Sequence, residues 1–543
     1  MTTQDKAFRL PRAAWPVFLT GLLFLVYAGT FGGLSDGRIL GNDAIGYAAE
    51  LARGAPHANP HHLAFHPLAS AIHSALSPFE SPTFALRSPL GLAMTAQVLL
   101  SALGGALAAL FFFRAARRTL GEARGAKVAA LTLTAALAFS SGHWLYASVG
   151  ETYLPAIAAE TLLLGLALRE RLERQVPLVA LIATLLAAVL LRQDSVLVAL
   201  PVALLLRPRR AALVLASAGA LAIAVYVVAW MGAGTGDGFT VWLRGLANSG
   251  LWGAPISLRN LSVGGTLALT TLSYPIWYAS QGFLHGDVDR ATASLLMGLA
   301  PWLLLAMGPR LGQLGRQGKT EGAPALERRR ALAALLSFAL LRFGFFAWWQ
   351  PGNMEYHTGT LTPLFLALAV WLGGRPAATL HAAGAWTFAA VLVIAGNVTS
   401  LIGPNQASDL DARAQEALEA AGPGGLVLSL DGLGHLALER ARGTHAGGTA
   451  DLPRILNASL VASGTNLDKL PELRAAIAHT LRSGGHVFAA RDMILPERFH
   501  HAPWPLDWTD SHHDGGMDKL VDGFAPTPVD MDAGLDSWLW RLE

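Results

Sequence analysis

Long apolar stretches with almost no charge recur along this chain of 543 residues, and they constrain its fold more than any other feature. Only 14% of the residues are charged and 53% are hydrophobic, whereas a soluble globular chain carries about 25% charged residues. A chain of this composition has too few charges to cover its surface in water. We therefore predict an integral membrane protein whose main solvent is lipid.

About eleven of these stretches are long enough to form full or tilted membrane helices, although several are short. The first apolar stretch, 15–32, is too long for the apolar region of a cleavable signal peptide and lacks an Ala-x-Ala cleavage site, so we interpret it as a membrane helix. The expected spans are 15–32, 89–113, 127–147, 154–168, 176–191, 194–206, 211–231, 291–307, 331–348, 360–374 and 382–400.

The distribution of Lys and Arg predicts the orientation of these spans, because basic residues are retained on the cytoplasmic side. Every basic cluster falls on that side if the N-terminus is cytoplasmic and the stretch 232–290 does not fully cross. That stretch, with Tyr274, Trp277 and Tyr278, is therefore expected to be re-entrant or interfacial. The clusters are Arg114/Arg117/Arg118/Arg124/Lys127, Arg169/Arg171/Arg174, Arg207/Arg209/Arg210, Arg310/Arg316/Lys319/Arg328/Arg329/Arg330, and Arg375.

This topology, N-terminus inside and C-terminus outside, divides the chain into two domains. Residues 1–402 form the transmembrane domain, with external loops at about 33–88 and 232–290, which leaves 403–543 outside the cytoplasm. The segment GGLVLSL, the helical pattern LPELRAAIAHTLRSGG and the segment HVFAARD predict a small α/β domain there. The last fifty or so residues have no periodicity and are expected to be irregular.

Bulk charge and cysteine content exclude several classes of function. The formal net charge of +3 is small for this length and gives no electrostatic support for nucleic-acid binding. The sequence contains no cysteine, so disulfides, thiolate catalysis and cysteine-bound zinc are all excluded.

The first external loop holds two candidate groups. Asp43 follows the first span closely and is placed to act as a general base or to cap the helix that begins at Ala44. His61, His62 and His66 lie close together, and such a cluster binds a metal or a phosphate. Their spacing matches no strong zinc signature, so we expect a structural or phosphate-contacting loop with His66 as its best candidate, and we assign no metal ligand.

Charged residues at the ends of apolar spans give the remaining candidates, because such residues are costly to bury without a role. Glu151 lies at the outer end of the third span, where it acts on a substrate or starts the next helix. Arg192 and Asp194 interrupt two short apolar segments, at the tip of a hairpin if the segments pair. There the arginine either binds a phosphate or only pairs with the aspartate.

A second arginine and its neighbours raise the same question further along the chain. Arg342 lies inside the apolar segment ALLRFGFFAWWQPGNMEYHTG, followed by Glu355 and His357 at its outer end. Arg342 is either a phosphate ligand or the partner of an acid on a neighbouring helix. The sequence does not decide which arginine meets a phosphate.

These motifs together resemble the GT-C superfamily of membrane glycosyltransferases. The resemblance rests on the acidic first external loop, the FHPLA and GETYLPA elements and the external domain, and covers residues 10–230 best. Within the superfamily it is closest to the bacterial relatives of protein O-mannosyltransferases with a DUF2723-type membrane core. Many of these relatives have a paired acid where this chain has Asn42 before Asp43, and this departure argues against a metal-assisted mechanism.

The resemblance implies a multi-pass protein of the bacterial inner membrane that moves a sugar from a polyprenyl-phosphate donor to a lipid, glycan or protein acceptor on the outer face. Asp43 matches the catalytic base, Glu151 the acid of the glutamate-x-tyrosine element, and His66 the histidine-proline element. A single displacement with Arg192 or Arg342 on the departing phosphate gives inversion. No cofactor is assigned, and a divalent cation is left open.

Two other classes of function compete with the transferase. Buried charge and a re-entrant segment also fit a transporter or lipid-handling protein, although no inverted repeat is visible in the sequence. A non-catalytic scaffold whose external domain binds a partner in cell-envelope assembly is the third hypothesis. Replacing Asp43 by Asn separates the transferase from the scaffold.

Overall fold

The chain forms two compact units, a helical unit that includes most of the first helix and runs from Tyr47 to Gly403, and a smaller unit from Pro404 onward. All candidate site residues except Asp43 belong to the described part of the helical unit. The computed structural model describes residues 14–34, 47–48, 50–52, 54, 59–79, 89–122, 125–233, 238–244, 257–284, 287–311, 323–349, 354–373, 376–401, 408–429, 438, 453–457, 470–490, 523–524, 526–528 and 539–543.

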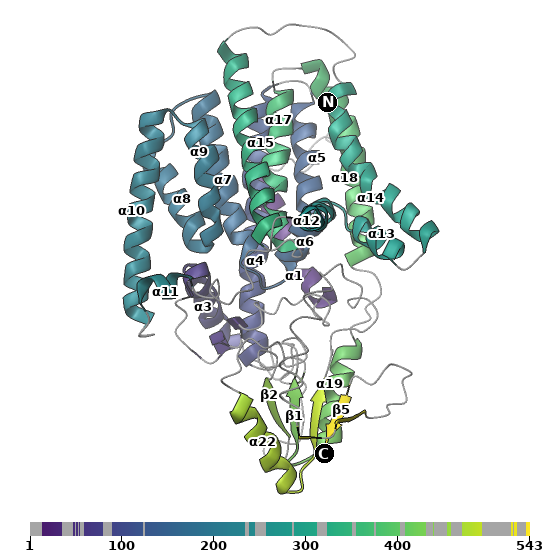
Figure 1. Cartoon of the computed structure of the whole chain (residues 1–543). Coiled ribbons are helices and arrows are strands. Elements are labelled where there is room, and N and C mark those ends of the chain that lie inside the picture. Colours follow the sequence, from purple (N-terminus) through teal and green to yellow (C-terminus); the bar gives the residue numbers. More distant parts are fainter. Residues whose placement is uncertain are drawn as a thin grey trace, which may run out of the picture. The chain divides into compact units, whose positions relative to one another are not determined.

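Each of the predicted apolar spans is helical (Figure 1). The long helices are α1 (Ala14–Leu34), α4 (Pro89–Leu120), α7 (Tyr153–Leu172), α10 (Pro208–Ala233), α14 (Val288–Leu311), α15 (Ala323–Trp349) and α18 (Pro376–Leu401). The shorter elements are η1 (Pro60–His62), α3 (Phe65–Leu76), η2 (Ser77–Phe79), α5 (Ala126–Ala138), α6 (Ser141–Ser148), α8 (Leu178–Leu191), η3 (Gln193–Val198), α9 (Ala199–Leu205), α11 (Phe239–Arg244), α12 (Leu258–Thr270), α13 (Pro275–Leu284), α16 (Met354–Thr358) and α17 (Leu361–Leu372).

Five of the described helices, α4, α10, α14, α15 and α18, are long and apolar enough to cross a membrane. The number becomes six if α5 and α6, which are bent by 59° at a short break, form one broken span. α8 has 14 residues and α9 only 7, so neither matches the full length that a bilayer requires. The total of eleven spans therefore stays a prediction, whereas the membrane character of the helical unit is established by these helices and their surfaces.

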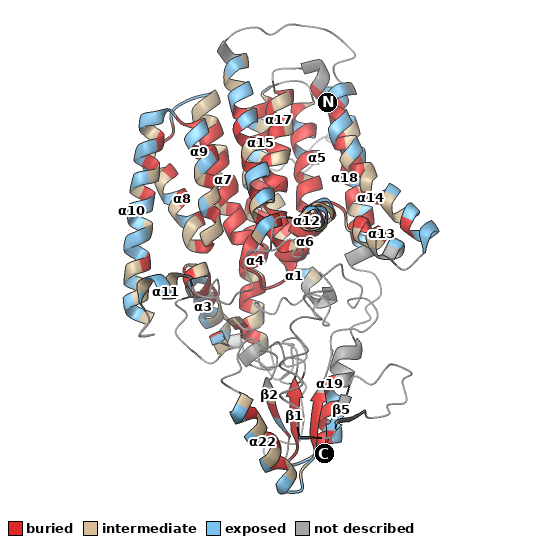
Figure 2. Cartoon of the chain, in the orientation of Figure 1, coloured by how far each residue is buried: buried red, intermediate tan, exposed pale blue. Residues whose placement is uncertain are grey.

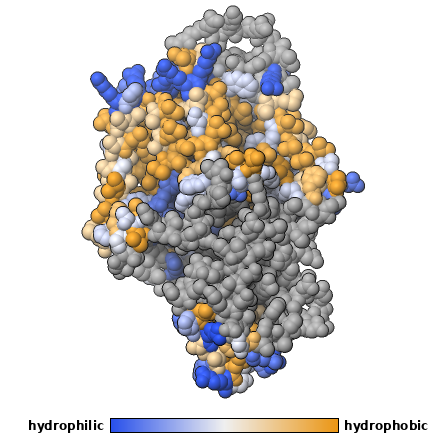
Figure 3. Space-filling view, in the orientation of Figure 1, coloured by the Kyte–Doolittle hydropathy of each residue, from blue (hydrophilic) through white to orange (hydrophobic). Residues whose placement is uncertain are grey.

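The surface of the helical unit is apolar where its outer helices face away from the bundle. In α10 only 22% of the most apolar 18-residue stretch is buried, and Ile223, Val228 and Met231 are each more than 60% exposed. Figure 2 shows the exposed outer side of α10 beside the buried interior, and Figure 3 shows apolar side chains over the same part of the surface. Such a belt is stable only against lipid, because in water it would be a large exposed hydrophobic patch.

Several described residues of the basic clusters lie together at one end of the helices. Arg171 near the end of α7 pairs with Glu327 near the start of α15. Arg210 at the start of α10 pairs with Glu170 of α7 at 2.6 Å. Arg328 donates a hydrogen bond to the carbonyl of Thr119 at the end of α4 (3.3 Å). We call this the basic end, and its assignment to the cytoplasmic side stays a prediction.

α8, η3 and α9 form a hairpin whose tip points away from the basic end. α8 runs alongside α10 in the same direction, because Val176 lies beside Arg210 and, further along, the hydroxyl of Tyr226 donates to the carbonyl of Val189 (3.4 Å). α9 ends at Leu205, directly before α10 begins at the basic end. The tip between α8 and η3 therefore lies at the opposite end, as the sequence suggests for Arg192.

The described part of the predicted re-entrant stretch contains three short helices, α11 of 6 residues, α12 of 13 residues and α13 of 10 residues. The turn between α12 and α13 packs on the α5–α6 break, where the backbone amide of Gly142 donates to the carbonyl of Thr271 (2.8 Å). Asn397 of α18 joins both segments, because its side-chain amide donates to the carbonyls of Phe139 (2.8 Å) and Leu272 (2.9 Å). Neither α12 nor α13 is long enough to cross a membrane alone.

The second unit is an α/β structure with a five-stranded sheet of order β2-β1-β3-β5-β4. Strands β1, β2 and β3 are parallel, and β5 pairs antiparallel with both β3 and β4. The prediction that the last fifty or so residues are irregular is wrong for 526–528 and 539–542, which form two strands of the sheet. β5 lies between β3 and β4 and buries Leu542, and a strand of four residues is too short to show periodicity. The elements are α19 (Ser408–Ala421), β1 (Leu426–Ser429), β2 (Arg454–Asn457), α22 (Leu470–Arg482), β3 (Val487–Ala490), β4 (Pro526–Pro528) and β5 (Leu539–Leu542).

Candidate active site

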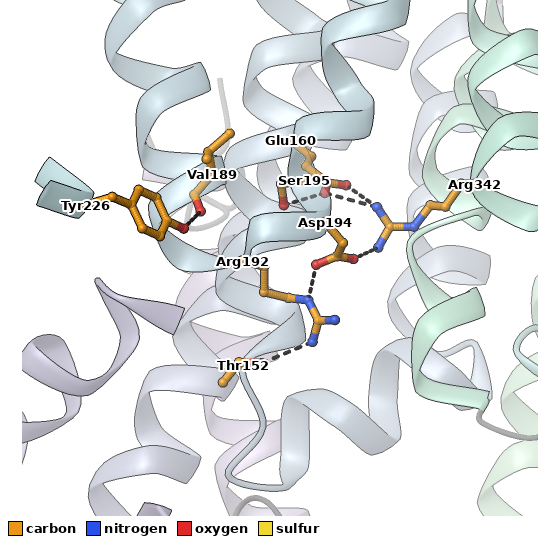
Figure 4. A network of polar contacts seen from close by, with 8 residues as sticks. All are labelled: Thr152, Glu160, Val189, Arg192, Asp194, Ser195, Tyr226 and Arg342. Atoms are coloured by element: carbon orange, nitrogen blue, oxygen red, sulfur yellow. Dashed lines mark hydrogen bonds and ion pairs between the residues drawn. The ribbon is translucent and has the colours of Figure 1, made fainter. Parts of the chain in front are cut away.

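Arg192 lies at the tip of the α8–α9 hairpin and is the centre of a buried polar network (Figure 4). Its extended backbone ends α8, so its side chain leaves the helix instead of pointing along it. The Nε of Arg192 donates to Oδ1 of Asp194 at 2.6 Å, and Nη1 donates to the hydroxyl of Thr152 at 3.2 Å. The predicted Arg192–Asp194 pair is therefore present, and Arg192 is only 6% exposed.

Two aromatic rings flank the Arg192 guanidinium. Its Cζ lies 3.8 Å from the ring centroid of Tyr153 and 5.5 Å from that of Tyr356. The planes of the two rings are 80° apart, so the cation has a close cation–π contact with Tyr153 and a longer one with Tyr356. Among the described residues, no group accepts a hydrogen bond from Nη2 of Arg192, so this edge of the cation is available to a ligand.

Arg342 of α15 faces the same network from the opposite side. Its Nη1 donates to both carboxylate oxygens of Glu160 of α7 at 3.0 Å, and its Nη2 lies 3.6 Å from Oδ2 of Asp194. Glu160 also accepts a hydrogen bond from the hydroxyl of Ser195 (2.7 Å). Of the two roles that the sequence leaves open for Arg342, the structure therefore shows pairing with an acid of a neighbouring helix.

Two further acids, Glu151 and Glu355, lie around the tyrosines that pack on Arg192. Both carboxylates act electrostatically on the hydroxyls of Tyr146 and Tyr153. Both are buried, with exposed fractions of 2% for Glu151 and 9% for Glu355. The side chains thus form a compact group of acids and phenols beside a cation, which suits the binding of a polar, hydroxylated ligand.

His357 lies next to this group but on its aromatic side. Its ring is fully buried, and its centroid lies 5.8 Å from that of Phe343 and 6.4 Å from that of Phe346. Phe346 stacks on Tyr356 at 4.8 Å between centroids. The structure therefore places His357 behind Tyr356 rather than beside Arg192.

The histidine loop docks on the hairpin tip. The backbone amide of Ala64 donates to the carbonyl of Leu190 at 2.8 Å, which brings His62 close to Arg192. Burial, together with the positive charge of Arg192, holds the pKa of His62 well below its ordinary value of 6.5, so this ring is neutral. His66 is buried one turn further on, where its ring meets that of Tyr47 edge to face at 4.6 Å between centroids.

A metal centre is not formed by the described residues. Across these ranges no group of three or more His, Asp or Glu side chains is arranged to hold a metal ion. His61, His62 and His66 instead pack as tilted or edge-on rings, with centroids 6.2 Å and 6.5 Å apart. The candidate general base Asp43 lies outside the residues that the structure describes, so its role stays a prediction.

The structure brings Arg192, Asp194 and Arg342 into direct contact, and Glu151 and Glu355 approach them through tyrosines. Sequence reasoning missed Glu160, although it is an acid within an apolar span and the argument that singled out Arg342 applies to it equally. It also missed Thr152 as a hydrogen-bond partner of Arg192. No sequence signal distinguishes this threonine from the many others that bond only their own helix.

Comparisons with known proteins place the fold. No family model and no curated protein sequence matches the chain. Among solved structures, ArnT from Cupriavidus metallidurans bound to undecaprenyl phosphate is similar, with 12% sequence identity, a TM-score of 0.53 and coverage of 98% of both chains. ArnT from the same organism in the apo state aligns with 13% identity, a TM-score of 0.43 and the same coverage.

The chain shares the ArnT fold. This likeness shows the fold alone, and membership of the GT-C superfamily stays a prediction that the fold supports. The ArnT-like fold does not confirm the likeness to the DUF2723-type group, which stays a prediction. At 12% identity it also leaves the chemistry to be argued from this chain's own residues.

Proposed function

We propose that this protein is a glycosyltransferase that takes a sugar from a polyprenyl-phosphate-linked donor, with Arg192 as the residue that binds the phosphate. The observation that carries the proposal is the open Nη2 edge of Arg192, a buried cation fixed in a fold shared with a protein bound to undecaprenyl phosphate. A guanidinium with a free N–H edge is suited to the oxygen atoms of a phosphate.

The reaction needs positive charge where the leaving group forms. When the bond between the sugar and the phosphate breaks, electron density moves onto the phosphate, and a cation within hydrogen-bond distance lowers the barrier. Arg192 is 6% exposed, so its charge acts in a medium of low dielectric constant, where it stabilises the developing anion more than a cation in water would. The tyrosine stack and Asp194 hold the guanidinium in one orientation before the substrate arrives.

The acids and phenols beside Arg192 supply the sugar-binding side of the proposed site. Carboxylates and tyrosine hydroxyls accept and donate hydrogen bonds to sugar hydroxyls. Glu151 and Glu355 are both within electrostatic reach of Tyr153, which stacks on Arg192. A sugar whose phosphate lies on Arg192 would thus have its hydroxyls next to these groups.

The acceptor hydroxyl needs a base, for which the proposal assigns Asp43. A single attack on the anomeric carbon from the side opposite the phosphate inverts its configuration. We propose that the reaction takes place on the outer face of the bacterial inner membrane, with the second unit also outside. The acceptor is a lipid, a glycan or a protein, and no cofactor is assigned.

Binding of undecaprenyl phosphate to the purified protein in lipid nanodiscs tests the role of Arg192. Loss of a hydrogen bond to a charged group costs about 1.5–3 kcal/mol, so Arg192→Ala should raise the Kd by about 10- to 150-fold. Arg192→Lys should fall between the two, because lysine keeps the charge but loses the planar fork. Arg209→Ala is the matched control, because Arg209 is an exposed arginine at the basic end and should leave the Kd unchanged.

Two outcomes would refute the proposal. Equal Kd values for wild type and Arg192→Ala, with both proteins showing the same unfolding temperature, would show that Arg192 does not bind the phosphate. Transfer of labelled sugar at the wild-type rate by Asp43→Asn would show that Asp43 is not the base. Movement of the labelled lipid across the bilayer without any transferred sugar would favour the lipid-handling alternative instead.

A further inference from the structure

The two buried arginines differ in what surrounds their N–H groups: among the described residues Nη2 of Arg192 has no acceptor, whereas the one unpaired donor of Arg342, Nε, lies against the backbone of Gly359. We infer that Arg342 is a positioning residue, which acts on the phosphate through Asp194 and Arg192 and does not contact the ligand. This inference rests on the proposed function, because it assigns the division of work within the same site. It also resolves a question that the sequence leaves open.

Arg342 has little capacity left for a ligand. Its Nη1 is shared between both oxygens of Glu160 and its Nη2 faces Oδ2 of Asp194, while the whole residue is only 1% exposed. Nε, the remaining donor, has no hydrogen-bond partner among the described residues, but Gly359 covers it. A Cβ added at Gly359 would lie 2.4 Å from Cζ and 2.6 Å from Nε of Arg342, so the glycine backbone is in direct contact with the cation. A phosphate would have to displace a carboxylate or the Gly359 backbone to reach Arg342.

Asp194 is the link between the two arginines. One carboxylate oxygen accepts from Nε of Arg192 at 2.6 Å, and the other lies 3.6 Å from Nη2 of Arg342. A carboxylate held at both oxygens has a fixed orientation, and it fixes the orientation of the arginine that it binds. Arg342 therefore determines where Arg192 points without touching what Arg192 binds.

Charge balance gives Arg342 a second effect on Arg192. Glu160 and Asp194 carry two negative charges, which Arg342 and Arg192 neutralise together (Figure 4). Without Arg342, the two carboxylates would have Arg192 as their only cationic partner within this network. Arg192 would then be drawn towards the acids, and these would compete with a phosphate for its N–H groups.

Arg342 also joins the three segments that carry the site. Its contacts reach α7 through Glu160, η3 through Asp194 and the turn after α16 through Gly359. α7 begins at Tyr153, one of the two rings on Arg192, and α16 carries Tyr356, the other ring. One side chain thus joins the segments that carry Arg192 and the two rings that flank it.

A double-mutant cycle on undecaprenyl phosphate binding tests the inference. Arg342→Met in the wild-type background should raise the Kd by about tenfold, a typical coupling between residues of one network. In the Arg192→Ala background the same change should have almost no further effect, because the residue through which Arg342 acts is already absent. If Arg342 contacts the phosphate itself, the change weakens binding in both backgrounds, and the inference is wrong.

Gly359→Ala provides a variant that keeps every charge in the network. The added methyl group displaces the Arg342 guanidinium, so it should raise the Kd in the wild-type background and not in the Arg192→Ala background. Gly384→Ala is the matched control, because a Cβ at this helical glycine would meet nothing within 4 Å. This arm remains informative if Arg342→Met does not fold, and equal Kd values for Gly359→Ala and Gly384→Ala would contradict the inference.

A chemical readout separates failure of this inference from failure of the proposed function. Phenylglyoxal modifies arginine, and mass spectrometry gives the rate at Arg192 without any bound lipid. Arg342→Met should slow the modification of Arg192, because the unpaired acids draw it inward; an unchanged rate overturns the positioning role. Undecaprenyl phosphate should protect Arg192 in the wild type, and lack of protection would overturn the proposed function alone.

Discussion

Asn397 is the residue whose replacement tests the architecture around the site most directly. It is fully buried, and its side chain makes three hydrogen bonds to backbone groups of two other segments. It donates to the carbonyls of Phe139 and Leu272, and it accepts from the amide of Tyr274 at 2.8 Å. Asn397→Leu keeps the branching of the side chain but removes all three hydrogen bonds. The perturbation therefore acts on the α5–α6 break and on the α12–α13 turn together.

The expected magnitude follows from the groups that lose a partner. A buried polar group without its hydrogen bond costs about 1–3 kcal/mol. The carbonyl of Leu272 keeps a longer contact from the amide of Ser141 at 3.4 Å, so its loss is the smallest of the three. The carbonyl of Phe139 and the amide of Tyr274 lose their partner, so we expect Asn397→Leu to lower the free energy of unfolding by about 2–6 kcal/mol. At about 1–2 °C per kcal/mol for a unit of this size, Tm should fall by about 2–12 °C.

Thermal unfolding followed by tryptophan fluorescence in nanodiscs measures this change, with the scan rate held constant. Thr399→Ala is the control on the same helix, because its exposed hydroxyl bonds only carbonyls of its own helix. Its Tm should stay within about 1 °C of the wild type, since surface substitutions away from special features change stability little. If Asn397→Leu unfolds at the same temperature as Thr399→Ala, the three hydrogen bonds do not join these segments.

Two further predictions concern the histidine loop and the helix packing. Burial holds the pKa of His62 below 6.5, so at low pH the unfolded chain binds a proton there that the folded chain does not. Stability should therefore fall as pH drops below about 6.5. In Tm measured against pH, His62→Gln should show a smaller fall than the wild type. Gly104→Ala should destabilise the α4–α7 contact by about 1–3 kcal/mol, because its Cβ would lie 2.5 Å from the backbone nitrogen of Pro155. Gly219→Ala is the control, because its Cβ would meet nothing within 4 Å, and its measured Tm should be unchanged or slightly higher.

Much of the helical unit could be predicted from the sequence because lipid imposes a simple rule on composition. A run of apolar residues bounded by basic loops has few alternatives to a helix in a bilayer, so all predicted spans are helical. The breaks were harder to predict. The α5–α6 bend is held by Asn397, which lies 258 residues away from Phe139 in the chain, and no local pattern shows such a contact.

In the site, too, contacts between residues close in the sequence could be predicted, whereas contacts between distant segments could not. Arg192 and Asp194 are two residues apart, so their pairing and their place at a hairpin tip are visible in the sequence. The partner of Arg342 is 182 residues away, and only packing of α15 against α7 selects Glu160. The stacking of Tyr153 and Tyr356 on Arg192 likewise depends on three segments that meet only in the folded chain.

The short limbs of the α8–α9 hairpin have a consequence for where a lipid carrier would meet Arg192. α8 has 14 residues, which at about 1.5 Å per residue reach only about 21 Å from the basic end. Hydrocarbon is about 30 Å thick, so on the predicted topology, with the basic end at the cytoplasmic surface, the arginine would lie below the outer headgroup layer unless the bilayer thins around it. Under the proposed function, a carrier phosphate would then have to move below the phosphates of the surrounding lipids together with its first isoprene units, and carriers with a stiff or bulky first unit would be the poorest substrates.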